Sequence, residues 1–457
     1  MFFFTNISAH YHTLMRLAVS QLVFAVLASS ATAAEITTLR QSVEYALANN
    51  RLLAADASSV DQAHAHVNGA AGRLLPSLDV STGVSRTDAP GDYFGIKLNQ
   101  QKITAADFTP AHLNNPGFIN NYRTRIGLTM PIYQGGALWA GKQQAMHQAD
   151  SSNFNHLYMK QQVIYQTIAA YVQVRQSDAQ IKAVESAMAA ARKRHQDTQA
   201  MHERGLLIDS DVMDAHVHLL RTTVKLQQAR NAYARSRDGL QQVMGIDQSV
   251  GLSTDEEAHL NGPQLVLQEA ITSALSARPD LKALEESYQA AKTEINQATA
   301  AFRPQVNLIA AQEWNDSTPG LRNPNAMVGA TVSMNFYSGG SDRAKERAAT
   351  AKLVSLEMRI SDHKHQIRNE VAHALRMLDE TRLRHQSESE ALKQSEESLR
   401  IKSLRYKQGL ATTTDLLDAQ LQVDTARLAS IHAKHGVTIA KAGLLLAVGM
   451  LNEEVIQ

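Results

Sequence analysis

No cysteine occurs among the 457 residues of the sequence. This absence excludes disulfide bonds, thiolate metal sites, a cysteine nucleophile and a lipid-modified N-terminal cysteine. Aromatic residues amount to only 5%, which is low for a chain of this length with one large packed core. The 45 basic and 44 acidic side chains nearly balance, so the charge gives no reason to expect nucleic acid as a partner.

Motifs of catalysis are also missing. The sequence has no phosphate-binding loop ending in Lys-Ser/Thr, no G-x-S-x-G elbow and no H-E-x-x-H zinc motif. Of the 18 histidines, the pairs spaced two apart point to different faces of a helix, and only His432 and His435 could share one. We therefore expect no enzyme activity, no catalytic residue, no cofactor and no metal site.

Proline is missing from two long stretches. All ten prolines lie within 76–131 or 263–324, and the stretches that follow are rich in Ala, Gln, Leu, Arg and Glu. Because proline breaks a helix interior, this composition predicts very long helices, with several shorter helices as the alternative. A helix from about Leu138 to His202 would be on the order of 100 Å long. Its apolar or small residues recur every 3.5 positions, which predicts a coiled-coil seam. The seam consists of Val163, Thr167, Ala170, Val174, Ser177, Ile181, Val184, Met188 and Ala191.

Each long helix is expected to end at a glycine turn. The turns lie at Gly205 and Gly409, and Ser210 and Thr413 are suitable N-caps for the helices that follow. Each half of the chain should therefore contain a hairpin of two antiparallel helices, with its tip near 205 or 409.

The two halves are predicted to be copies of one unit. The segment "LRQSVEYALANNRLLAA" from Leu39 aligns with "LQEAITSALSARPDLKA" from Leu267 at an offset of 228. The double glycine at 135–136 aligns with that at 339–340 at an offset of 204, so the first copy carries 24 extra residues in between. This pattern indicates an internal duplication, with repeat 1 at about 35–246, a linker at about 247–264 and repeat 2 at about 265–457.

Four segments alternate apolar and polar residues. They lie at about 77–88, 120–133, 305–315 and 326–337. In the second, Ile126 and Leu128 share one face while Arg123 and Arg125 share the other. Segments of about ten residues with one apolar side are typical of outer-membrane barrel strands, although a half-buried strand of a soluble protein alternates identically.

The N-terminus is typical of a secretory signal. An apolar run follows Arg16 and precedes the small residues that end at Ala34, so residues 1–34 are expected to be a signal peptide, with a membrane anchor as the alternative. No later apolar run reaches about 18 residues, which leaves β-strands as the means of crossing a membrane. Four strands cannot close a barrel, so strands from two or three chains must combine.

Together these features resemble the TolC family of trimeric outer-membrane efflux and secretion channels. The resemblance rests on the duplication, on "YQGG" ending at Gly136 and "YSGG" ending at Gly340, and on "YKQGLATTTDLLDA" from Tyr406. It implies an α+β membrane protein in which long antiparallel coiled-coil helices form a hollow α-barrel. This α-barrel is joined to a transmembrane β-barrel with four strands per chain in a homotrimer.

The resemblance also implies a function, a location and partners. The chain would be the exit duct of a tripartite efflux or type I secretion system, passive and gated at its periplasmic tip. It would lie in the bacterial outer membrane with a large periplasmic part. Its partners would be outer-membrane lipid, a periplasmic adaptor protein and an inner-membrane transporter of the RND, ABC or MFS type. The alternative is a non-channel periplasmic or surface coiled-coil structural protein, which would have no use for four segments with an apolar face.

Roles for residues at the hairpin tips follow from the same resemblance. The matched positions are Asp415 and Asp418 of an acidic constriction ring, the latch tyrosine Tyr406, the acidic latch residue Asp211, and the adaptor-contacting pairs Gly205-Leu206 and Gly409-Leu410. One departure is Ala411, which stands where the family has an arginine partner of the latch. An ordinary explanation of the acids remains open, because Asp is favoured in the first turn of any helix.

Overall fold

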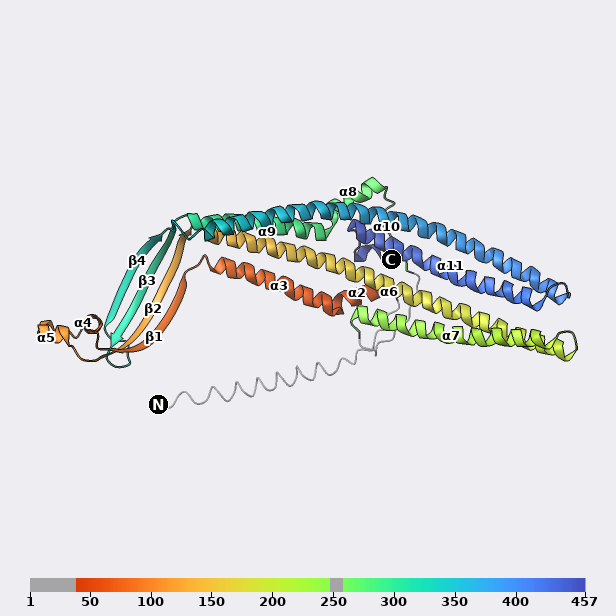
Figure 1. Cartoon of the computed structure of the whole chain (residues 1–457), viewed down its shortest axis with the longest axis horizontal. Helices are drawn as coiled ribbons and strands as arrows, with labels where there is room; N and C mark the ends of the chain where they lie inside the picture. The colour runs from red at the N-terminus through yellow and green to blue at the C-terminus, as the bar shows by residue number, and fades with distance from the viewer. Residues whose placement is uncertain (1–37, 247–257, 457) are drawn as a thin grey trace, which may run out of the picture.

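The computed structural model describes residues 38–246 and 258–456. The chain forms a long body with a small sheet at one end and two helical hairpins at the other (Figure 1). The signal peptide expected at 1–34 and most of the linker expected at about 247–264 lie outside the described residues.

Two very long helices run along most of the molecule. Helix α6 (Ala137–Glu203) and helix α10 (Ser341–Lys407) have 67 residues each, and their return helices α7 (Asp209–Met244) and α11 (Thr413–Val448) have 36 each. At about 1.5 Å per residue, α6 and α10 are each on the order of 100 Å long. None of the helices that the structure describes combines the length and the apolar character needed to cross a membrane.

The predicted seam of α6 lies on the inner side of that helix. Its buried members are Val163, Thr167, Val174, Ser177, Val184 and Ala191, and its half-buried members are Ala170, Ile181 and Met188. Helix α6 as a whole contacts α7, α9, α3 and α11. Small residues at this spacing let the helix backbones approach closely.

Each half begins with two shorter helices separated by a break. They are α2 (Leu39–Asn49) and α3 (Arg51–Gly72) in the first half, and α8 (Leu267–Ala277) and α9 (Pro279–Thr299) in the second. The remaining short elements are α4 (Pro90–Asn99), α5 (Pro110–Asn114) and the 3₁₀ turns η1 (Ala105–Phe108), η2 (Ala300–Phe302) and η3 (Glu453–Val455).

The four strands form one antiparallel sheet in chain order. They are β1 (Ser77–Thr87), β2 (Ile119–Gln134), β3 (Gln305–Asp316) and β4 (Pro324–Ser333), so β2 and β3 join the two halves. The sequence predicted the last strand to reach about 337, which is wrong. Ser333 pairs with Gln305, the first residue of β3, so the residues after Ser333 have no strand of this chain to pair with.

The extra residues of the first half lie in one connection. The β1–β2 connection covers 88–118 and contains α4, η1 and α5, whereas the β3–β4 connection covers only 317–323. These connections differ by the same 24 residues that separate the two sequence offsets.

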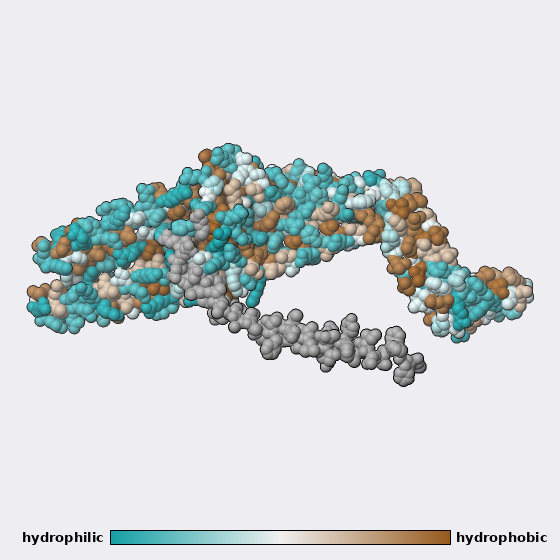
Figure 2. Space-filling view, turned by 180° about the vertical axis from the view of Figure 1, so that it is seen from behind, coloured by the Kyte–Doolittle hydropathy of each residue, from teal (hydrophilic) through white to brown (hydrophobic). Residues whose placement is uncertain are grey.

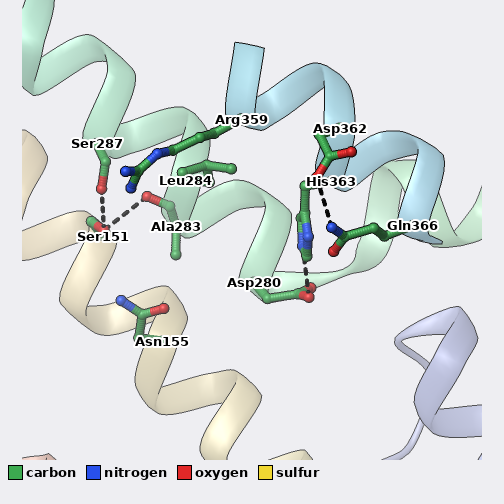
Figure 3. Close-up of a pocket in the computed structure, with 10 residues that line it drawn as sticks. All are labelled: Ser151, Asn155, Asp280, Ala283, Leu284, Ser287, Arg359, Asp362, His363 and Gln366. Carbon is green, nitrogen blue, oxygen red and sulfur yellow. Dashed lines mark hydrogen bonds and ion pairs between the residues drawn. The ribbon is translucent and has the colours of Figure 1, made fainter. Parts of the chain in front are cut away.

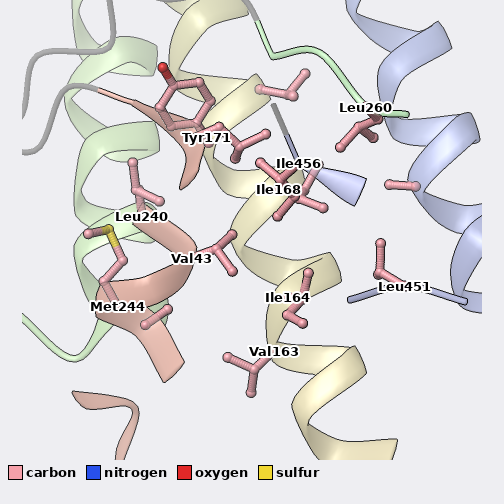
Figure 4. Packing of buried hydrophobic residues seen from close by; sticks show 14 of the residues in the cluster. Val43, Val163, Ile164, Ile168, Tyr171, Leu240, Met244, Leu260, Leu451 and Ile456 are labelled. Carbon is pink, nitrogen blue, oxygen red and sulfur yellow. The ribbon is translucent and has the colours of Figure 1, made fainter. Parts of the chain in front are cut away.

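The main hydrophobic core sits near the middle of the body. It gathers side chains from α2, α6, α7 and the C-terminal end of the chain, among them the fully buried Ile168, Tyr171, Leu240 and Met244 (Figure 4). A second cluster joins α8, α9, α10 and α11. The long helices therefore extend from a packed middle toward the sheet on one side and toward the hairpin tips on the other.

Candidate functional site

One face of the sheet is apolar and exposed. Leu78 and Val80 of β1 are each 68% exposed, and Val328 of β4 is 84% exposed. The register places Leu78 opposite Leu128, which lies opposite Ala310, and Ala310 lies opposite Val328, so these side chains share one face. Figure 2 shows apolar atoms gathered over this end of the molecule. A continuous apolar surface of this kind marks a contact with lipid or protein.

The opposite face of the sheet is polar. Ser81, Arg125 and Glu313 lie opposite one another across β1, β2 and β3, and Gly83 and Arg123 continue the same face one pair along. The polar face is not uniform, because Ile309 of β3 and Met327 of β4 also lie on it. A wall with one apolar and one charged face separates two different environments.

The tip of the first hairpin is a glycine turn. Gly205 has φ 72°, a left-handed conformation that a residue without Cβ adopts at little cost. The N–H of Leu206 donates to the carbonyl of Met201 at 3.0 Å, which closes the turn, and the Leu206 side chain is 69% exposed.

Helix α7 begins without a side-chain cap. Its N-cap is Ile208, so the prediction of Ser210 as the cap is wrong, and Ser210 lies inside the first turn. Asp209 and Asp211 occupy that first turn, where the helix dipole favours acidic groups. Asp209 is paired with His202 at 3.1 Å, whereas the carboxylate of Asp211 has no hydrogen bond to the second hairpin among the described residues.

The second hairpin has the same turn. Gly409 has φ 73°, and the N–H of Leu410 donates to the carbonyl of Arg405 at 2.8 Å. Leu410 is exposed, as its counterpart at the first tip is. The guanidinium of Arg405 also donates to the carbonyl of Leu410 at 3.3 Å, which ties the turn a second time.

Asp415 is part of a capping box. The N-cap of α11 is Thr412, one residue before the predicted Thr413. The Asp415 N–H donates to the Thr412 hydroxyl at 3.1 Å, and the Thr412 hydroxyl and N–H donate to Asp415 Oδ2 at 2.7 and 3.0 Å. The hydroxyl bond and then the N–H bond hold the pKa of Asp415 below its ordinary value, with Lys402 nearby. The carboxylate of Asp415 is thus kept ionised, and its Oδ1 takes no part in the capping box.

The other predicted tip residues surround this cap. Asp418 is exposed one turn further along α11, at a spacing that puts it on the same side as Asp415. The Tyr406 hydroxyl lies 3.4 Å from the hydroxyl of Thr413, which is buried. Ala411 is a half-buried turn residue with no charge to offer the first hairpin.

A contact between the two hairpins was not predicted from the sequence. Arg194 of α6 donates to the side-chain oxygen of Gln420 on α11 at 3.2 Å, and the Gln420 amide donates to Asp424 at 2.8 Å. Burial lowers the pKa of Arg194 despite the opposing charge of Asp424 and the nearby Tyr406. A charged residue at the edge of an otherwise small and apolar seam was the only signal in the sequence that could have pointed to this contact.

A second unpredicted feature is a junction that occurs in both halves. The side chain of Asn50, between α2 and α3, donates to the carbonyl of Val243 at 2.7 Å. At the equivalent point between α8 and α9, Arg278 donates to the carbonyl of Ala447 at 3.3 Å. The offsets of 228 and 204 relate these pairs, so the same contact anchors the return helix of each hairpin to the break in the preceding helices.

The junction of the second half is charged. Arg278, which is 3% exposed, pairs with Asp280 at 2.6 Å and with Glu370 of α10 at 2.5 Å. The ring nitrogen Nε2 of His363 on α10 also lies 2.9 Å from Asp280 Oδ2, and Figure 3 shows this contact. Burial opposes ionisation of Asp280, but Arg278 and then His363 outweigh it and lower the pKa of this carboxyl.

The histidines were expected to form no metal site. His432 makes a hydrogen bond with Gln180. Among the described residues, one group of three side chains could hold a metal ion, and His432 is not part of that group. That group consists of His147, Asp150 and Glu286, in which the His147 ring already contacts Glu286 at 2.7 Å. A hydrogen bond between His147 and Glu286 accounts for this contact.

Comparison with known proteins gives one family and several related chains. The family model described as "Outer membrane efflux protein" matches residues 42–246 and 270–450. The outer membrane efflux protein BepC of Brucella suis is 25% identical over 299 residues, 65% of each chain, so the match spans just under two thirds of that relative. The alkaline protease secretion protein AprF of Pseudomonas aeruginosa is 22% identical over 73% of this chain and 71% of its own.

Solved structures share the fold. The Campylobacter jejuni CmeC outer membrane channel has a TM-score of 0.79 and 16% identity, over 91% of this chain and 86% of its own. The outer membrane protein VceC of Vibrio cholerae has a TM-score of 0.76 and 17% identity, over 90% of this chain and 96% of its own. The fold class predicted from the sequence, with long helices joined to four strands per chain, is confirmed.

Proposed function

Since the chain belongs to the outer membrane efflux protein family, we propose that it is the exit duct of a tripartite efflux or type I secretion system. The family description is that of a transport protein and not of an enzyme. The duct lies in the bacterial outer membrane, and the long helices extend into the periplasm. Transport through it is passive, and a partner opens it.

The sheet is the observation that carries this proposal. Its strands β1 and β4 each pair on one side only among the described residues, and one of its faces is exposed and apolar. Unpaired backbone groups cannot face lipid, so a membrane-spanning sheet must close on itself. Three copies supply twelve strands, which suffices for a closed barrel with a water-filled lumen.

The same observation weighs against the alternative of a coiled-coil structural protein. Such a protein gains nothing from Leu78, Val80 and Val328 on one exposed face. The polar opposite face, with Arg123 and Arg125, is suited to a water-filled lumen.

The hairpin tips are the gate in this proposal. Three copies of Asp415 and Asp418 form an acidic ring that attracts cations and repels anions. The capping box engages one oxygen of Asp415, so each copy keeps its negative charge and one free oxygen. Tyr406 and Asp211 lie beside this ring as latch residues, and Arg194 with Gln420 provides a link between the hairpins where Ala411 cannot.

Partners would meet the protein at the exposed leucines. Leu206 and Leu410 stand at the outer ends of the two hairpins, each after a left-handed glycine. They are the contact for a periplasmic adaptor protein, which in turn joins an inner-membrane transporter of the RND, ABC or MFS type. Relatives named for efflux and for protein secretion support both kinds of system.

The oligomer and the ring are tested together on purified protein. Light scattering of the detergent-solubilised chain should give three copies, and planar bilayers should show ion conductance. Replacing both acids (Asp415→Asn, Asp418→Asn) keeps the shape and removes the charge, so block by divalent cations should weaken. Asp379→Asn, an exposed acid in the middle of α10, is the matched control. A stable single-copy species refutes the duct, and unchanged block removes both acids from the pore.

A further inference from the structure

The connection between β1 and β2 has no counterpart in the second half. It holds α4, whose neighbours in the sheet are β2 and β3, the two central strands. A loop that only linked two strands would stand clear of the sheet, whereas α4 folds back over it. Figure 1 shows α4 beside the end of the sheet that is far from the helices.

The face that α4 covers follows from its contacts. A cavity of about 480 Å³ lies between α4 and the sheet, on the scale of a small-ligand pocket. Its walls include Gly83, Arg123 and Glu313 of the sheet and Asp92 and Asn99 of α4. Every strand residue of this lining except Val84 belongs to the polar face defined by the register. Helix α4 therefore lies on the side of the wall that faces away from lipid.

A chain of buried amides fixes α4 in this position. Gln100, which follows α4 and is 1% exposed, donates to the Asn120 carbonyl at 2.8 Å and to the Asn121 side chain at 3.0 Å. Asn121 in turn donates to Asn315 of β3 at 2.8 Å, and Asn315 donates to Glu313 at 3.0 Å. Buried polar networks with every member bonded are rigid, because breaking one member leaves others unsatisfied.

A second set of contacts makes α4 and η1 one unit. Lys97 of α4 pairs with Asp107 of η1, and the rings of Phe94 and Phe108 meet edge to face at 5.6 Å. The Lys97 hydrogen bond, followed by those of Thr104, lowers the pKa of Asp107 to about 2. The pKa of Lys97 is raised by the same hydrogen bond, so both groups are ionised at neutral pH.

We propose that α4 lines the pore and forms a constriction at the end opposite the hairpin tips. The inference rests on the proposed function, because a lumen exists only if the sheet closes into a barrel. Three copies of α4, each held on the inner wall by Gln100, narrow this mouth. Asp92 of α4 and Arg123 of β2 then determine which charged solutes leave.

The absence of cysteine makes the test direct, because any introduced cysteine is the only one. Asp92→Cys, or Asn99→Cys if the first variant does not assemble, is incorporated into planar bilayers. A water-soluble methanethiosulfonate reagent is then added to the solution. Conductance should fall in steps as the copies react. Val80→Cys on the apolar face is the matched control, and its conductance should stay unchanged.

The outcomes separate the two proposals. If the unmodified protein conducts but reaction at Asp92→Cys and at Asn99→Cys, verified by mass, leaves the current unchanged, the constriction is refuted and the duct stands. If neither introduced cysteine can be reached from water, the constriction is refuted as well. If the unmodified trimer conducts nothing under any condition, the duct itself fails. Gln100→Ala should raise the conductance of the otherwise native protein, since α4 then leaves the wall.

Discussion

Removing Arg278 should lower the local stability of the junction in the second half, because this residue makes ion pairs with both Asp280 and Glu370. The substitution Arg278→Ala leaves Asp280 buried, with His363 as its remaining partner, and leaves Glu370 half exposed and free. Breaking a fully buried ion pair costs about 3–5 kcal/mol. Because Glu370 regains water and Asp280 keeps His363, we expect a local loss of about 2–4 kcal/mol.

Hydrogen exchange measures this loss where it occurs. Local opening free energies vary along a structure, so the effect should be confined to the start of α9 and the facing turns of α10 and α11. A loss of about 2–4 kcal/mol corresponds to exchange that is about 30- to 700-fold faster, since 1.4 kcal/mol is tenfold. Arg230→Ala is the matched control, because Arg230 is exposed and paired with Glu185, a contact worth at most about 1 kcal/mol.

The first half supplies an internal comparison. Arg278→Asn copies the residue at the equivalent Asn50, so it can restore the bond to the Ala447 carbonyl but not the charge for Asp280. Its exchange should fall between that of the native protein and that of Arg278→Ala. Equal exchange rates in the native protein, Arg278→Ala and Arg278→Asn would refute the reasoning. So would an acceleration of exchange in Arg278→Ala that is as large around Asn50 as around position 278.

The same junction should respond to acid. The pKa of Asp280 is lowered in the folded protein, so its contribution to stability is present above its unfolded pKa of about 4. That contribution is lost as the pH falls through the lower folded pKa. Acid should therefore lower the protection of amides at this junction, measured as the exchange rate of an unstructured amide divided by the observed rate at the same pH, and it should do so less in Asp280→Asn.

Two further outcomes concern the tips and turns. Thr412→Ala removes the capping box, which should cost about 1 kcal/mol of stability, measured by denaturation. The pKa of Asp415 should also rise toward its ordinary value, measured by NMR titration of its carboxyl. Thr412→Ser should behave as the native chain, and an equal loss of stability in both variants would contradict the cap. Gly409→Ala and Gly245→Ala both place alanine at a positive φ, but a Cβ at Gly245 would lie 2.4 Å from the Asn49 carbonyl oxygen while none is within 4 Å at Gly409. Gly409→Ala should cost about 1 kcal/mol and Gly245→Ala clearly more, and equal melting temperatures would contradict the clash.

Much of the fold could be predicted from periodicity and proline placement. A helix of 67 residues is visible in the sequence because proline is absent from it and its small residues recur every 3.5 positions. Strand alternation is visible because one face meets a different environment from the other. The end of β4 was predicted too late, because alternation continues through Phe336 whereas pairing requires a neighbouring strand, which β3 provides only to Ser333.

The tip caps and the junctions depend on geometry that a single sequence does not carry. Thr412 and Thr413 are equally good caps by residue type, and only the path of the turn after Gly409 decides between them. The offset of 228 aligns Asn50 with Arg278, but two residues so different in size and charge give no sign of a shared contact. Their common role appears only when the carbonyls of Val243 and Ala447 are seen in the same place.

The two hairpins have helices of equal length, but their bases are held by different kinds of contact. The base of the first hairpin is held by a neutral amide, whose strength does not change with pH or salt. The base of the second is held by Arg278, which also binds Glu370 on the long helix α10, so α8, α9, α10 and α11 meet at one charged point. Charge-assisted bonds are stronger than neutral ones but depend on ionisation. Acid that protonates Asp280 therefore weakens the base of the second hairpin and leaves the contact of Asn50 unchanged.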